Sequence, residues 1–198
     1  MSANVAMRTE LSGARKPINL LWSGVDVSGL QADLAANPQL WDANPFRRSA
    51  GSPHIELSDI IVRYNDWTNF KDRVSFNEPH ESIWWGAYRY LPSVRGLVFD
   101  LMRRLCGERL GMVLITRIPP GASCKPHKDG GWHATYYDKY AIQVKGNDRQ
   151  SFCFDECRLV TKQGDVFSFD NSFTHWVTNE SDEDRITLIV SIKTTKEN

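Results

Sequence analysis

Three residues in the second half of the chain have the types and spacing that suit a metal ion. His127 and Asp129 stand two apart, so on an extended segment both side chains point to one side and can bind one ion. His175 follows in a separate predicted strand. Two imidazoles and one carboxylate on one face of an octahedral ion leave three positions open, which suits a non-haem Fe(II) that binds a bidentate co-substrate and O2 together. The alternative is that these are ordinary polar residues of loops and turns, because an HxD pair often occurs by chance.

Arg185 is a candidate anchor for an acidic co-substrate. The predicted final strand, 185–193, has a polar face with Arg185, Thr187, Ile189 and Ser191, and an apolar face with Ile186, Leu188, Val190 and Ile192. We expect the apolar face to pack outward on helices and the polar face to look into the interior. An interior guanidinium needs a carboxylate partner, which a dicarboxylate ligand supplies in two-bond geometry. The alternative is an exposed salt bridge with the acidic residues within 180–184.

Three spaced segments together resemble a known family. They are 116–127 (TRIPPGASCKPH), 164–175 (GDVFSFDNSFTH) and 185–190 (RITLIV). This ordered set resembles the aspartyl/asparaginyl β-hydroxylases, a family of Fe(II)/2-oxoglutarate-dependent dioxygenases, over roughly residues 111–193. The resemblance implies a double-stranded β-helix, of the jelly-roll or cupin type. It also implies an enzyme that uses Fe(II), 2-oxoglutarate and O2 to hydroxylate a substrate C–H bond, with release of succinate and CO2.

The resemblance assigns roles to individual residues. His127, Asp129 and His175 become the catalytic iron ligands, and Arg185 meets the far carboxylate of 2-oxoglutarate. Thr116 falls where the family has a hydroxyl residue that assists at 2-oxoglutarate, and Lys139 falls near a basic residue of the family's active site. The segment 130–137 is either a surface loop with incidental aromatic residues or a substrate lid. On the second interpretation the substrate contacts are Trp132, His133 and Tyr136.

Asp129 indicates which branch of the family the chain resembles. Some members of the family, the animal enzymes among them, lack the carboxylate ligand, so its presence favours the bacterial and phage-like branch. It also argues against halogenation, which requires that position to be vacant for chloride. Two rival functions stay open: a cupin-like metal-binding protein, and a cupin metalloenzyme that uses no 2-oxoglutarate. Arg185 disfavours both, because neither needs an anchor for a co-substrate.

The elements that must position these residues are mainly strands. Helical periodicity predicts a helix from an N-cap at Ser28 to Asn37-Pro38, and a second helix over 93–106 capped by Ser93. Strands are predicted at 17–22, 60–62, 111–118, 139–145, 151–154, 158–161, 166–170, 175–178 and 185–193, with 42–54 as a loop. The sequence therefore predicts a mainly β fold with supporting N-terminal helices. We expect one domain, 1–198, in which 1–110 supports a catalytic core at 111–193.

Composition limits the partners. The 198 residues carry 24 basic and 24 acidic side chains, so steering toward nucleic acid or anionic lipid is not expected. The first 17 residues contain no apolar run that would make a secretory signal or a membrane span. We expect a cytoplasmic protein with four reduced cysteines, acting on an amino acid, a peptidyl residue or a small polar metabolite. The sequence predicts no oligomeric state.

Overall fold

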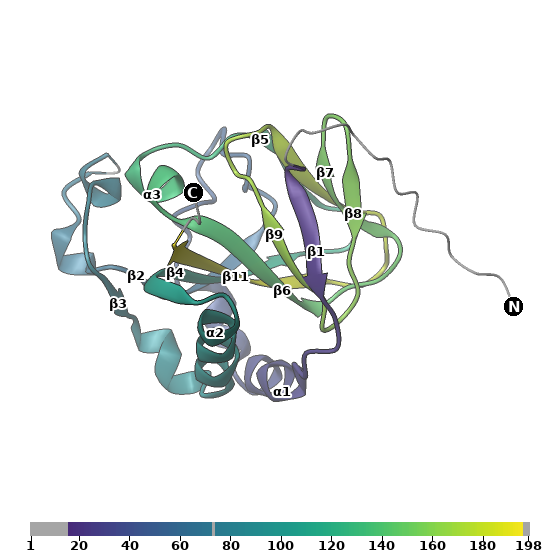
Figure 1. Ribbon diagram of the computed structural model, residues 1–198, viewed down its shortest axis with the longest axis horizontal. Coiled ribbons are helices and arrows are strands. Elements are labelled where there is room, and N and C mark those ends of the chain that lie inside the picture. The colour runs from purple at the N-terminus through teal and green to yellow at the C-terminus, as the bar shows by residue number, and fades with distance from the viewer. Residues whose placement is uncertain (1–15, 73, 196–198) are drawn as a thin grey trace, which may run out of the picture.

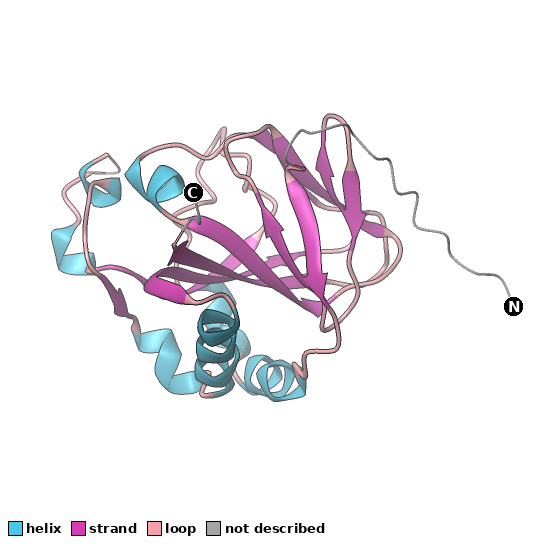
Figure 2. Cartoon of the chain, in the orientation of Figure 1, coloured by secondary structure: helices cyan, strands magenta, loops and turns pink. Residues whose placement is uncertain are grey.

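The chain folds into two antiparallel sheets with its two longer helices on one side, as the computed structural model describes it for residues 16–72 and 74–195 (Figures 1 and 2). The strands are β1 (Ile18–Trp22), β2 (Ser58–Asn65), β3 (Ser82–Trp84), β4 (Gly107–Ile118), β5 (Ser123–His127), β6 (Asp138–Lys145), β7 (Gln150–Phe154), β8 (Arg158–Val160), β9 (Val166–Phe169), β10 (His175–Asn179) and β11 (Arg185–Thr194). The helices are α1 (Ser28–Ala36), α2 (Ser93–Arg104) and α3 (Trp132–Tyr136), with short 3-10 helices at Pro38–Asp42, Trp67–Asn69, Ser75–Asn77 and Gly86–Tyr90.

The two sheets face each other as in a jelly roll. Among the described residues the larger sheet runs β1-β9-β6-β11-β4-β2-β3 and the smaller one β5-β10-β7-β8. The predicted mainly β, jelly-roll fold with supporting helices is confirmed. The larger sheet, however, crosses the boundary predicted at residue 110, since β1 pairs with β9 and β2 pairs with β4. The first half of the chain therefore extends the sheet as well as supporting it.

The apolar face of β11 packs toward the helices, as predicted, and its other face contacts a second apolar cluster that was not predicted. Leu188, Val190 and Ile192 are buried in one cluster with the apolar residues of α1 and α2. On the other face, Ile189 packs against a second cluster between the sheets, which includes Phe152 and Phe167. Figure 1 shows α1 and α2 lying against one face of the larger sheet. The inward face of β11 is thereby left free to hold polar residues.

The helix ends differ from the predicted ones. Ser28 and Ser93 are the first helical residues, and neither makes a capping bond through its side chain. Instead the Asp26 carboxylate accepts from the Ser28 N–H at 2.9 Å, and the Asp33 carboxylate accepts from the Ser93 N–H at 2.9 Å. Asp33 lies on α1, so it ties the two helices together. A carboxylate from another helix thus replaces the local cap that the sequence predicts.

The connection between helix α2 and strand β4 is also shorter in sequence than predicted. The helix ends at Arg104 and β4 begins at Gly107, joined by Cys106 with a left-handed φ of 50°. A Cβ at Gly107 would lie 2.6 Å from the Ile192 side chain. Glycine is needed there because β11 passes so close, and the left-handed residue is Cys106. The early start of β4 lets its first residues pair with the end of β11, where Gly107 is the partner of Thr194.

Strand β5 and helix α3 were not predicted as such. β5 contains Pro126, which has no N–H to donate, and it lies at the edge of the smaller sheet where that loss is tolerated. α3 is a single short turn within the predicted loop or lid. Both elements flank the metal-ligand motif, so their positions decide how the site is built.

Candidate metal centre and its cavity

The structure brings the three predicted metal ligands together. His127 ends β5 and His175 begins β10, and the two residues are direct partners in the ladder between these strands. Their ring centroids lie 4.4 Å apart, and the Asp129 carboxylate lies 3.5 Å from His127 Nε2. One ligand atom from each of the three residues lies within 4.8 Å of the others. The sequence spacing and the strand register therefore converge on one candidate site.

The neighbouring backbone orients each ligand for a metal ion. His127 Nδ1 lies 2.8 Å from its neighbour Lys125 O, and His175 Nδ1 lies 3.0 Å from Phe173 O. With Nδ1–H donating to a carbonyl, each ring presents the lone pair of Nε2. Asn171 donates to the second Asp129 oxygen at 3.1 Å, and leaves the other for an ion. This donor set, two oriented imidazoles and one held carboxylate, fits Fe(II).

Charges at the site favour an ionised carboxylate. Burial alone would raise the pKa of Asp129, but the contact with His127, the charge of Lys139 and the Asn171 bond together hold it well below its ordinary value. Burial lowers the pKa of His175. In the metal-free chain the pKa of His127 rises to about 10, because the contact with Asp129 outweighs burial. Asp129 is therefore ready to bind a cation without first losing a proton.

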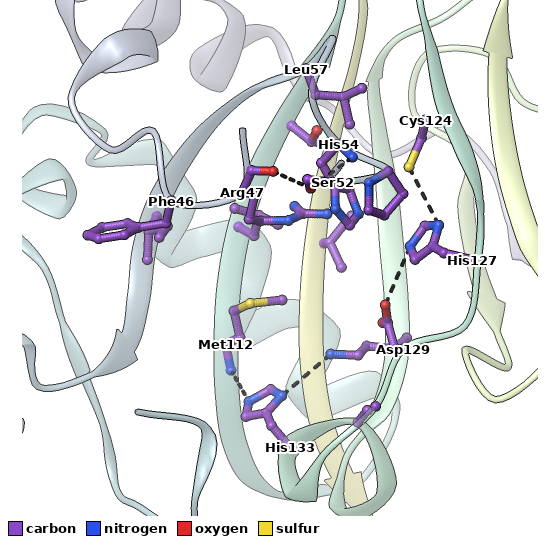
Figure 3. A pocket seen from close by; sticks show the side chains of 18 of the residues that line it. Phe46, Arg47, Ser52, His54, Leu57, Met112, Cys124, His127, Asp129 and His133 are labelled. Atoms are coloured by element: carbon purple, nitrogen blue, oxygen red, sulfur yellow. Dashed lines mark hydrogen bonds and ion pairs between the residues drawn. The ribbon is translucent and has the colours of Figure 1, made fainter. Parts of the chain in front are cut away.

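A cavity of about 580 Å³ opens beside the three ligands, between the sheets and the segment 46–77 (Figure 3). Two of the predicted co-substrate residues, Thr116 and Lys139, line it. The Thr116 hydroxyl is buried and has no partner among the described residues. A buried, unpartnered hydroxyl that lines a cavity next to the metal ligands is suited to a polar ligand.

Lys139 lies fully buried in the wall of this cavity. Its ammonium donates to Ser191 Oγ at 2.9 Å and lies 3.5 Å from His133 Nδ1. Burial lowers its pKa to about 8, although the Asp129 charge opposes the shift. A buried ammonium needs an anionic partner, and none of the ion pairs found among the described residues includes Lys139.

The lowered pKa of Lys139 should make stability depend on pH. Between the folded pKa of about 8 and the ordinary value of 10.5 the unfolded chain binds the extra proton, so the free energy of unfolding rises with pH. In urea unfolding of the metal-free protein, wild type should gain on the order of 3 kcal/mol over Lys139→Met across this interval. For Lys162→Met, which replaces an exposed lysine, the difference from wild type in free energy of unfolding should stay constant across this pH interval. A constant difference for Lys139→Met would contradict the burial of a charged lysine.

Arg185 is buried but does not line the cavity. It is 1% exposed, and the exposed salt bridge with residues 180–184 is therefore not formed. Nη1 donates to Thr161 Oγ1 at 3.2 Å, while Nη2 has no partner among the described residues. Its cross-strand partner is Ile118, which does line the cavity. Arg185 thus lies next to a residue of the cavity wall, and its role as an anchor stays a prediction.

The predicted substrate contacts on α3 separate into two groups. His133 is buried and lines the cavity, where its Nε2 accepts from the Met112 N–H at 3.2 Å. Trp132 and Tyr136 do not line it, but stack on each other with centroids 5.1 Å apart. The Tyr136 hydroxyl accepts from Arg109. In this structure α3 therefore presents only one of the three residues to the cavity.

Sequence reasoning missed other residues of the site. Arg47 and His54 lie in the predicted loop 42–54, and both line the cavity. Cys124 also lines it, with Sγ 3.9 Å from His127 Nδ1. The described region contains no disulfide at any of the four cysteines, in line with the expected reduced thiols. No spacing in the sequence identifies Arg47 or His54, because the loop reaches the site through tertiary contacts such as the one with β5, where Lys125 N–H donates to Pro53 O at 2.9 Å.

The sequence comparison decides the family. A profile of the family described as aspartyl/asparaginyl beta-hydroxylase matches residues 62–195, more than half of the chain. The chain belongs to this family. The matched region contains all three candidate metal ligands, so the predicted resemblance is confirmed. Among proteins of curated function, no sequence matches the chain.

Solved structures show the same fold. A 2OG-Fe(II) oxygenase family oxidoreductase from Burkholderia pseudomallei aligns with a TM-score of 0.52 and 15% identity, covering 81% of this chain and 77% of that one. The viral collagen prolyl hydroxylase of Paramecium bursaria Chlorella virus-1, solved with 2OG, aligns with a TM-score of 0.54 and 10% identity, covering 91% and 97%. Each similarity shows the fold alone.

Within the described residues, none of the helices has the length and apolarity to span a membrane.

Proposed function

We propose that this member of the aspartyl/asparaginyl β-hydroxylase family is an Fe(II)/2-oxoglutarate-dependent dioxygenase. It would hydroxylate a C–H bond of an amino acid, a peptidyl residue or a small polar metabolite, with release of succinate and CO2. The observation that carries the proposal is the oriented set of His127, Asp129 and His175 at the edge of a cavity with buried cationic side chains nearby. The cytoplasmic location also remains a prediction.

The residues of the candidate site have separate roles in the proposed reaction. Bound iron would supply O2 activation coupled to decarboxylation of the co-substrate. His127, Asp129 and His175 would hold the ion, while Lys125 O, Phe173 O and Asn171 keep their donor atoms oriented. Three protein ligands leave room for a chelating 2-oxo acid and for O2. The far carboxylate of 2-oxoglutarate would be neutralised by Arg185, with Lys139 and Thr116 as further polar contacts.

The cavity wall provides the water exclusion that such a reaction requires. Phe152, Phe169 and Val177 surround the metal ligands and are all buried. Phe152 stacks on the His175 ring with centroids 5.6 Å apart. Apolar contact on this side fixes the ring and keeps bulk water away from the open positions of the ion.

The two rival functions differ in what they require of the interior. A cupin-like metal-binding protein, or a cupin metalloenzyme without 2-oxoglutarate, has no need of buried cations close to the ion. Arg185 is 1% exposed and Lys139 is 5% exposed, and each costs solvation free energy unless an anion joins it. These two cations support a dicarboxylate co-substrate over either rival.

Formation of succinate tests the proposed reaction. With Fe(II), O2 and 2-oxoglutarate the purified protein should form succinate slowly even without substrate, and faster with the correct member of a panel of amino acids and short peptides. Omitting iron, or replacing Asp129 with alanine, should reduce the yield to background. The complete reaction for this test contains folded protein and one equivalent of 2-oxoglutarate. If it forms succinate only at background level, the proposal is contradicted.

A further inference from the structure

The cavity wall opposite the jelly-roll core is aromatic. Phe46, Phe70, Phe76 and Tyr64 line the cavity from the segment 46–77. The Phe70 and Phe76 rings contact each other with centroids 5.4 Å apart, and Phe70 is 39% exposed. Trp67 stacks on Phe70 with centroids 5.0 Å apart and is 47% exposed. An exposed aromatic surface continuous with a cavity is suited to an apolar part of a ligand.

Arg47 lies beside this wall and reaches toward the metal ligands (Figure 3). Among the described residues its only carboxylate partner is Asp59, which one of its nitrogens contacts at 3.3 Å. Asp59 is buried, so it holds the guanidinium in place. A guanidinium has five N–H donors in a planar fork, so Arg47 keeps donors for a second, ligand carboxylate.

Arg47 is also close enough to the site for its charge to act there. After burial, its positive charge is among the causes that lower the pKa values of His54, Lys139 and His175. When His127 and His175 bind an ion as neutral rings, the charged side chains that line the cavity are Arg47, Asp129 and Lys139.

With Fe(II) and 2-oxoglutarate bound, the net charge of the site is one that a single further anion would cancel. In the proposed complex, Asp129 and the chelating carboxylate of 2-oxoglutarate balance the two charges of Fe(II). The far carboxylate balances Arg185, and Asp59 balances Arg47. The charge of Lys139 is then unmatched, which leaves the buried site with one net positive charge. Because uncompensated charge is costly in a poorly solvated interior, a substrate with one negative charge binds most favourably.

We propose that the substrate of this site carries a carboxylate, which Arg47 binds, and an apolar body of aromatic size, which packs on Phe46, Phe70 and Phe76. The inference rests on the proposed dioxygenase function, since the charge balance includes Fe(II) and 2-oxoglutarate. Arg47 is then a specificity-determining residue that aims the substrate at the metal. Neither the metal ligands nor the anchor of the co-substrate discriminates between substrates in this way.

Three matched probes test this proposal by binding alone. 3-Phenylpropionate carries both features, 3-phenylpropionamide lacks the charge, and propionate lacks the ring. Each is titrated by ligand-observed NMR into the full chain loaded anaerobically with Fe(II) and 2-oxoglutarate, with the visible absorption band of that complex as a check on loading. 3-Phenylpropionate should bind at least tenfold more tightly than either of the other two, because a charge-assisted contact and a buried ring each contribute more than tenfold in affinity.

Two variants test which residues cause the difference in affinity between the probes. Arg47→Gln should bind the acid and the amide equally while its absorption band is retained, and the matched control Arg48→Gln, at a neighbour that does not line the cavity, should keep the tenfold preference. Phe70→Ala should reduce the preference for the phenyl acid over propionate. Equal binding of acid and amide by wild type, or a preference that survives in Arg47→Gln, would overturn the proposal. If the band is absent and the acid preference persists, the dioxygenase function fails but the carboxylate subsite stands.

Discussion

Replacing His175 with alanine should lower the affinity of the protein for Fe(II) by about a hundredfold or more. His175 is buried at the start of β10 and is one of the three candidate protein ligands. Loss of a residue that merely orients a ligand commonly costs about 10- to 100-fold in metal affinity, so loss of the ligand itself should cost at least as much. Anaerobic titration with Fe(II), followed by competition with a chelator, measures the change.

Two further variants make that result specific. His80→Ala removes a half-buried histidine that does not line the cavity, and it should leave Fe(II) affinity unchanged. His175→Gln keeps a polar group of similar length and should also bind Fe(II) poorly, which separates loss of a ligand from loss of packing on Phe152. Thermal unfolding of the metal-free variants checks that each one is folded. Fe(II) affinity at the wild-type level in folded His175→Ala would show that the ion lies elsewhere.

Replacing Arg185 with glutamine should weaken 2-oxoglutarate binding by about thirtyfold or more while iron still binds. Truncating one partner of a buried charged pair costs about 2 to 5 kcal/mol, and about 2 kcal/mol corresponds to thirtyfold. Arg185 is 1% exposed and its Nη2 has no partner among the described residues, so the ligand carboxylate would complete its contacts. Glutamine retains a polar group for Thr161, which limits structural damage.

Lys139→Met provides the comparison, since Lys139 lines the cavity and Arg185 does not. Titration of the anaerobic Fe(II) protein with 2-oxoglutarate gives the affinity of each variant, and titration with Fe(II) alone gives the control. We expect the larger loss of 2-oxoglutarate affinity from Arg185→Gln. An unchanged affinity in that variant, with a large loss in Lys139→Met, would transfer the anchor role to Lys139.

The metal ligands could be predicted because their positions depend on local geometry. This holds for His127 and Asp129, because residues two apart on an extended segment share a side. The pairing of β5 with β10, which brings His175 opposite His127, was not predicted and is seen only in the structure. The faces of β11 were predictable for the same reason, since alternation fixes which side chains point inward. Periodicity therefore predicted the faces of the strands and helices, and the spaced motifs that resemble the family predicted the candidate ligands, whereas the strand pairing had to come from the structure.

The remainder of the site depends on contacts that no local pattern specifies. Arg47 and His54 enter the cavity because the backbone of their loop docks on β5 through Pro53. In the same way the N-terminus of α2 is held by Asp33, which lies 60 residues earlier in the chain. Such contacts join segments that are far apart in the sequence, so composition and periodicity cannot reveal them. The aromatic residues of 130–137 likewise left a surface loop and a substrate lid both open, and in the structure Trp132 and Tyr136 stack on each other outside the cavity.

Anaerobic titration of the protein with Fe(II) and then 2-oxoglutarate tests the central claim most directly. A 2-oxo acid chelated to Fe(II) gives a visible charge-transfer band that neither component gives alone. The account predicts a band that saturates at one iron and one 2-oxoglutarate per chain, and that is lost in His175→Ala. No band with wild-type protein, or a band that persists at full intensity in His175→Ala, would contradict it.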